Sequence, residues 1–208
     1  MLAAKPGRGR ELMIKARLWV LMFIFLLLAA CAASTPSVTK PEAAAGLPRR
    51  CVLDAVPQYY QSGPNCGPVS MHMVLAYYGV KLPREKIEKD IRTSTKGTSL
   101  ISLLEYPRTL GFKTEDKEKA TINEVVSNIA KGRPVIVRQW MKPESKLRQT
   151  DSHIRVVIGY DLDKQTIYMR DPNKSGLSTV SFQEFTNLWD FTATRVGGAN
   201  NWMLVIYK

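Results

Sequence analysis

The sequence has few of the side chains that bind metal ions or form covalent cross-links. Its 208 residues include three cysteines, Cys31, Cys51 and Cys66, and two histidines, His72 and His153. It contains no Cys-x-x-Cys pair and no histidine cluster, so the usual ligand patterns of zinc sites and disulfide-rich domains are absent. We therefore expect no metal and no cofactor, and we expect any chemistry to depend on single cysteine, histidine and acidic side chains.

Long apolar runs are also scarce, and the one clear run covers residues 18–28. The basic segment 13–17 precedes it, and Leu28-Ala29-Ala30 ends directly before Cys31. The run is too short to span a membrane comfortably and has the pattern of a signal peptide. Its end resembles the bacterial lipobox, in which the cysteine is lipidated. An ordinary secretory signal or an uncleaved anchor is the alternative.

This pattern predicts three regions in the chain. Residues 1–31 are the lipoprotein signal peptide with its lipobox, and residues 32–50, rich in Ala, Ser, Thr, Pro and Lys, are a flexible linker. Residues 51–208 are long enough for one domain with its own core. Alanines follow Cys31, so resemblance to Gram-negative lipoproteins places the protein in the cell envelope, on the outer membrane facing the periplasm.

The charge of the chain is strongly positive, with a formal net charge of +12. Without residues 1–31 there are 25 basic and 17 acidic residues, a net charge of +8. The basic residues are scattered and not interleaved with aromatic residues, which argues against a nucleic-acid partner. On an exported protein, such an excess favours proximity to anionic lipid or wall polymers.

Residues 61–79 join a turn-rich loop to an apolar helix pattern. Asn65 suits the N-cap position, Gly79 suits the helix C-terminus, and a helix face repeats at Met71, Val74, Leu75 and Tyr78. Cys66 then lies in the first turn, where free N–H groups and the helix dipole lower the pKa of a thiol. Gln61 has an amide that can donate to a developing oxyanion. This is the pattern of a cysteine nucleophile, with a Cys51–Cys66 disulfide as the structural alternative.

A second group of candidate residues lies near the C-terminus. His153 begins the apolar run Ile154–Ile158, which predicts a strand, and a strand end is a rigid place for a general base. Asp171 ends the next predicted strand, residues 165–170, where it can accept the imidazole N–H. The alternatives are an ordinary buried histidine and an aspartate that only caps a turn. His72 follows Cys66 by six residues in a helix and points away from it, so we assign it to packing.

The remaining elements give no sign of chemistry. We expect helices over residues 83–91, from residue 99 with Pro107 as its kink or its end, over 121–131 and from Ser181, with strands over 134–140 and 202–207. Residues 141–150 are polar and predict a surface loop that forms a wall or lid of a cleft.

Together these residues resemble a known family. The segments that carry the resemblance are Gln61 with Asn65-Cys66-Gly67-Pro68, His153 with Val156-Val157-Ile158-Gly159-Tyr160-Asp161, and Asp171-Pro172 with Phe182, Phe185 and Trp189. They resemble the peptidase C39-like branch of the papain-like cysteine peptidases. The resemblance implies an α+β fold, in which an N-terminal helical part carrying the cysteine packs on a small antiparallel sheet carrying His and Asp.

Carried over residue by residue, the resemblance makes Cys66 the nucleophile, His153 the base, Asp171 the orienting acid and Gln61 the oxyanion donor. Two departures are visible. C39 peptidases that remove double-glycine leaders are fused to a transporter and an ATPase, whereas this chain has no Walker motif and no multi-span region. Gln61 also precedes the cysteine by five residues, where papain-like enzymes usually have six.

The resemblance implies a lipid-anchored cysteine peptidase that acts on a peptide or protein substrate in the cell envelope. A catalytically silent peptide-binding or envelope-assembly lipoprotein is the alternative, and a structural lipoprotein with a Cys51–Cys66 disulfide is the third possibility. The sequence leaves the substrate and the oligomeric state open.

Overall fold

The computed structural model describes residues 46–91, 97–192 and 200–208. The predicted signal peptide, Cys31 and nearly all of the predicted linker lie outside the described residues. In chain order the elements are β1 (Arg50–Val52), α2 (Cys66–Tyr77), α3 (Arg84–Ile91), α4 (Leu100–Thr109), β2 (Lys113–Lys117), α5 (Ile122–Ala130), β3 (Val135–Trp140), α6 (Pro143–Arg148), β4 (Ser152–Asp161), β5 (Thr166–Arg170), β6 (Leu177–Ser181), α7 (Phe182–Trp189) and β7 (Met203–Tyr207). Across the described ranges, no helix has the length and apolar character needed to cross a membrane.

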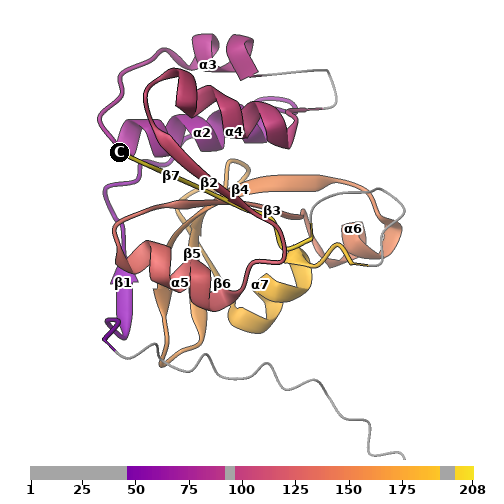
Figure 1. The fold of residues 1–208 in the computed structure, drawn as a ribbon. Coiled ribbons are helices and arrows are strands. Elements are labelled where there is room, and N and C mark those ends of the chain that lie inside the picture. Colours follow the sequence, from indigo (N-terminus) through magenta and orange to yellow (C-terminus); the bar gives the residue numbers. More distant parts are fainter. Residues whose placement is uncertain (1–45, 92–96, 193–199) are drawn as a thin grey trace, which may run out of the picture. The chain divides into compact units, whose positions relative to one another are not determined.

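One antiparallel sheet organises the described residues. Its strand order is β2-β7-β3-β4-β5-β6, and β1 pairs with β4 outside this path. β4 is the longest strand and pairs with β3, β5 and β1. Helices α2, α3 and α4 lie on one side of this sheet, and α5 and α7 lie on the other (Figure 1).

Side chains of β4 alternate between two hydrophobic cores, one on each face of the sheet. Ile154, Val156 and Ile158 are buried against the residues of α2, while Val157 packs with the residues of α5 and α7. This alternation matches a strand covered on both faces, which is why every residue of β4 after Ser152 is buried.

Gly159 lets β4 change partner. The pairing of β4 with β5 shifts register between Val157 and Gly159, and Gly159 faces Val52 of β1. A Cβ atom at this position would lie 2.8 Å from the Cys51 carbonyl oxygen and 3.1 Å from the Val52 Cα atom. Backbone atoms this close cannot move aside cheaply, so the approach of β1 requires glycine here.

The helix α2 begins at Cys66 as the sequence predicts, and Gly79 follows its end at a φ of +80°. Two details differ from the sequence expectation. Asn65 occupies the N-cap position, but its backbone is not extended (φ −106°, ψ 23°) and its side chain makes no capping bond. Its Nδ2 donates instead to the Ser62 carbonyl at 3.0 Å. The helix is also buried almost all round, since α3 and α4 cover the side opposite the sheet.

Three other expectations need correction. Pro107 lies inside α4, which continues to Thr109, because a proline in the last turn costs the helix few hydrogen bonds. The predicted loop 141–150 contains the short helix α6, with a proline at its start. The strands β1 and β6 were not expected, since β1 has three residues and β6 alternates without a strong apolar run.

Candidate active site

Cys66 is the first residue of α2, and its side chain is half-buried beside the larger core. Burial raises the pKa of the thiol, but a hydrogen bond and the positive charge of His153 outweigh it, together with backbone N–H groups of Ile154 and Gly67. The net pKa of Cys66 therefore lies below that of an ordinary thiol. The helix start and the histidine both favour the thiolate, as expected for a nucleophilic cysteine.

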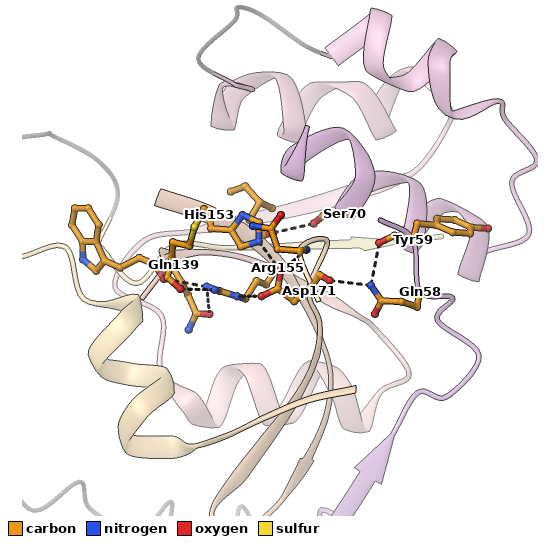
Figure 2. A network of polar contacts seen from close by, with 11 residues as sticks. Gln58, Tyr59, Ser70, Gln139, His153, Arg155 and Asp171 are labelled. Carbon is orange, nitrogen blue, oxygen red and sulfur yellow. Dashed lines mark hydrogen bonds and ion pairs between the residues drawn. The ribbon is translucent and has the colours of Figure 1, made fainter. Parts of the chain in front are cut away.

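Hydrogen bonding ties this helix to the strand that carries the histidine. The Ser70 hydroxyl, one turn after Cys66, donates to the Ile154 carbonyl at 3.3 Å (Figure 2). Gly67 packs directly against Thr98, since a Cβ atom at position 67 would lie 2.8 Å from the Thr98 Cβ. Thr98 thus occupies the space that a side chain at position 67 would need.

His153 lies near the start of β4, opposite Gln139 of β3. Its Nε2 hydrogen-bonds to Oδ1 of Asp171 at 2.7 Å, and each of these side chains is 1% exposed. Nε2 is thus engaged by the acid, which leaves Nδ1 for the thiol. Burial lowers the pKa of His153, but the hydrogen bonds with Asp171 and Cys66 and the charge of Asp171 raise it more, so the net pKa is raised.

Asp171 directly follows β5 and is held by several donors. Besides His153, the backbone N–H of Asn173 donates to its Oδ1 at 2.8 Å. Burial raises the pKa of this carboxyl, yet its hydrogen bonds with His153 and Arg155 and their positive charges hold the net pKa far below the usual range. Asp171 is therefore an ionised carboxylate that fixes the imidazole tautomer and stabilises its cation.

Sequence reasoning missed Arg155, which is buried beside the same carboxylate. Its Nε donates to Oδ2 of Asp171 at 2.8 Å, and the side chain is 4% exposed. Arg155 follows His153 by two residues, so both lie on one face of β4. A basic residue within an apolar strand, two positions from a candidate base, is the sequence signal that could have found it.

Gln61 lines the same cleft as Cys66. Its backbone N–H donates to the Pro172 carbonyl at 3.0 Å, so the segment before α2 runs along the residues after Asp171. Its Oε1 is buried and has no hydrogen-bond partner among the described residues. Gln58 also joins the segment before α2 to the residues after β5, because its amide donates to the Asp171 carbonyl at 2.9 Å (Figure 2).

A cleft of about 700 Å³ opens over these residues. Cys66, His153 and Gln61 all contribute to its lining, which also includes Pro64, Gly97, Trp140, Met141, Gln149, Thr150, Asp151 and Ser152. The segment 141–150 thus forms part of the cleft wall, as the sequence predicted. A thiol, an imidazole and an amide that converge on one cleft have the arrangement needed for acyl transfer.

A second cavity, of about 450 Å³, lies on the other side of the acid. Asp171 and Arg155 contribute to its lining, together with Met169 of β5 and residues of β6 and α7. Met141 is the one residue shared by the two linings, whereas Cys66 and His153 belong to the cleft alone.

Cys51 and His72 lie away from this chemistry. The Cys51 thiol donates to the Ile129 carbonyl at 3.6 Å and packs in the core beneath α5, on the face of the sheet opposite Cys66. Both cysteines are free thiols, so the alternative of a Cys51–Cys66 disulfide is wrong for this structure. The His72 ring packs on Tyr59 with 4.5 Å between ring centroids, which agrees with its predicted packing role.

Solved structures confirm the predicted fold class. A protein of Bacillus anthracis described as a C39-like peptidase is 20% identical, with a TM-score of 0.61 over 76% of this chain and 98% of that one. The peptidase domain of Streptococcus ComA, described as a bi-functional ABC transporter, is 17% identical, with a TM-score of 0.54 over 72% and 96%. Xylellain, a cysteine protease from Xylella fastidiosa, is 13% identical, with a TM-score of 0.51 over 79% and 87%. At these identities, the likenesses establish the α+β papain-like fold.

Comparison with curated protein sequences found no match. The model of the Peptidase_C39 like family, in contrast, matches residues 53–195, which are most of the chain. This match includes all four residues that the sequence analysis placed in the site, Gln61, Cys66, His153 and Asp171. The chain therefore belongs to the Peptidase_C39 like family.

Proposed function

We propose that this chain is an active cysteine peptidase that hydrolyses a peptide or amide bond in the bacterial cell envelope. The observation that carries the proposal is the chain of contacts from Cys66 through His153 to Asp171 at the wall of an open cleft. A lowered pKa of the thiol and a raised pKa of the imidazole favour the thiolate–imidazolium pair from which such enzymes react.

In the proposed mechanism each of these residues has a step. The Cys66 thiolate attacks the carbonyl carbon, and the Cys66 backbone N–H and the Gln61 amide receive the oxyanion. His153 then gives its proton to the leaving amine, which produces an acyl-enzyme. In the second half, His153 takes a proton from water, the hydroxide attacks the thioester, and the thiol is released. Asp171 keeps the imidazole oriented throughout.

The second candidate function is a silent peptide-binding or envelope-assembly module. A protein that only holds a peptide needs the cleft but has no need of a buried imidazole–carboxylate pair. The buried, fully ionised Asp171 and the perturbed pKa of the thiol are costly features that serve chemistry better than binding. They favour the enzyme.

A peptide library separates these functions. We expect the domain, residues 46–208, to cut a proteome-derived peptide mixture within hours, with new termini identified by mass spectrometry. The Cys66→Ala variant should produce none of these termini, because the remaining oxyanion donors alone give a rate orders of magnitude lower. Cys51→Ala is the matched control and should cut like the wild type. Peptides that bind both the wild type and Cys66→Ala without any cleavage would support the silent module instead.

We further propose that a lipid on Cys31 anchors the protein to the outer membrane, facing the periplasm. Residues 18–31 provide the apolar run and the lipobox-like end that support this proposal. Replacing Cys31 by serine in the full chain is expected to move the protein from the membrane fraction to the soluble periplasmic fraction and to remove palmitate labelling. A Cys51→Ser chain should stay in the membrane fraction. Unchanged fractionation and no palmitate label in the wild type would argue for an ordinary secretory signal or an uncleaved anchor.

A further inference from the structure

Arg155 connects the acid of the site to the wall of the cleft. On one side its guanidinium donates to Asp171, and on the other its Nη1 and Nη2 donate to the carbonyls of Trp140 and Met141, at 3.1 and 2.8 Å (Figure 2). Trp140 and Met141 both line the cleft. One buried side chain therefore joins two parts of the site that come from different strands.

The two oxygens of Asp171 have separate partners. Oδ1 receives His153, while Oδ2 receives Arg155. The carboxylate cannot rotate without breaking both bonds, so Arg155 fixes the plane in which His153 is held. A guanidinium suits this task because its donors form a rigid planar fork.

Gln139 fixes the guanidinium in turn. It lies on β3, and its Oε1 accepts from Nη1 of Arg155 at 3.3 Å. The other end of the same amide donates to the Phe185 carbonyl of α7 at 3.0 Å, which determines which end of the amide faces Arg155. The side chains of Gln139, Arg155 and Asp171 are all buried.

We infer that Arg155 is a positioning residue, which orients the Asp171 carboxylate toward His153 and joins it to the cleft wall at Trp140 and Met141. This inference rests on the proposed peptidase function. Arg155 itself does not line the cleft with Cys66, so it acts through Asp171 and through the wall and not on the substrate.

The electrostatics give this role a signature of its own. Asp171 raises the pKa of His153, whereas the charge of Arg155 lowers it. Among the described residues that line the cleft with His153, the other titratable groups are Cys66 on α2 and Asp151 in the loop before β4. Removing Arg155 therefore has two opposite effects on the pKa of His153, since losing its charge raises the pKa and losing the orientation of Asp171 lowers it. A substitution that keeps the charge but not the planar fork isolates the positioning role.

NMR titration of the histidine ring protons tests this in a Cys66→Ala background, where the imidazole titrates without a coupled thiol. The chain has two histidines, so His72→Gln assigns the signals. Relative to Cys66→Ala alone, we expect Asp171→Asn to lower the pKa of His153. Arg155→Lys keeps the charge but cannot hold the carboxylate in the same plane, so it should lower the pKa in the same direction.

Turnover tests the positioning itself in the chain that retains Cys66. Both Arg155→Met and Arg155→Lys should lower kcat on a cleaved peptide by roughly 10- to 100-fold, because neither side chain can bridge the carboxylate and the two carbonyls. If Arg155→Met does not fold, the kcat of Arg155→Lys alone tests the positioning role. Unchanged kcat in the lysine variant, or a pKa of His153 that does not fall in the lysine variant, would overturn the inference. A wild type without any hydrolysis refutes the proposed function instead, and the NMR titration still decides whether Arg155 acts on His153.

Discussion

Replacing His153 by alanine is expected to slow alkylation of Cys66 at pH 6 by roughly 100-fold or more and to abolish peptide hydrolysis. Two of the influences that lower the pKa of Cys66, a hydrogen bond and a positive charge, come from His153. Burial, which raises the pKa, remains in the variant. Each unit by which the pKa rises removes about nine-tenths of the thiolate at a pH below it, and the general acid for the leaving amine is lost as well.

The rate of reaction at Cys66 should depend on pH in a way that reflects both partners of the pair. In the wild type the reactive pair requires a deprotonated thiol and a protonated imidazole. The rate should rise through the lowered pKa of Cys66 and fall through the raised pKa of His153, and both shifts enlarge the fraction of the protein that holds the thiolate–imidazolium pair. In His153→Ala the alkylation rate should keep rising above pH 9, as for a buried thiol without a partner.

The measurement is intact-mass labelling with iodoacetamide at a series of pH values, with peptide hydrolysis followed in parallel. His72→Gln is the matched control, since His72 packs on Tyr59 and should leave the alkylation of Cys66 unchanged. Equal alkylation rates for His153→Ala and the wild type at pH 6 would mean that the helix start alone activates the thiol. The thiolate–imidazolium pair would then have to be abandoned.

Replacing Asp171 by alanine is expected to destabilise the domain by about 3–5 kcal/mol, because removing one partner of a buried ion pair leaves the other charge without compensation. The remaining charge is Arg155, which is 4% exposed. A loss of this size is a large part of the total stability of an ordinary domain. Chemical denaturation followed by circular dichroism measures it, and hydrolysis should fall together with stability.

A double variant separates the lone charge from the lost contacts. Asp171→Ala combined with Arg155→Met buries no uncompensated charge, so it should be more stable than Asp171→Ala alone while remaining inactive. The exposed pair Arg49–Asp163, with both side chains 59% exposed, is the control, and Asp163→Ala should change the denaturation midpoint little. A double variant less stable than the single would show that Arg155 stabilises the fold through its carbonyl contacts even without its acid.

The contribution of Asp171 to stability also depends on pH. Its folded-state pKa is depressed, so its stabilisation is fully present above the unfolded pKa of about 4 and is lost as the pH falls below that value. The wild type should therefore lose stability in acid more steeply than the double variant.

The sequence predicted those features that depend on local patterns. Cys66, His153 and Asp171 each stand at the end of an element that apolar periodicity or turn residues mark, which is why their positions could be inferred. Arg155 could not be assigned in this way, because its role depends on the register that brings β3, β4 and the end of β5 together. Periodicity predicts a strand but does not say which buried charge on it meets which acid.

Short and irregular elements were missed for a related reason. β1 lies at the boundary between the predicted linker and the predicted domain, and Gly159 permits it to approach β4. Asn65 has the residue type of a cap, yet a carbonyl three residues earlier competes for its side chain. In each case a tertiary or loop contact outweighs the local preference.

The second cavity has a consequence for inhibitor design. A compound bound there would contact Asp171 and Arg155 while leaving the space beside Cys66 and His153 empty. Such a compound would disturb the orientation of the imidazole without competing with the peptide, so it should reduce the maximal rate and leave the apparent affinity for substrate largely unchanged. It would also need no reactive group directed at the thiol, which separates it from the alkylating agents that disable cysteine enzymes in general.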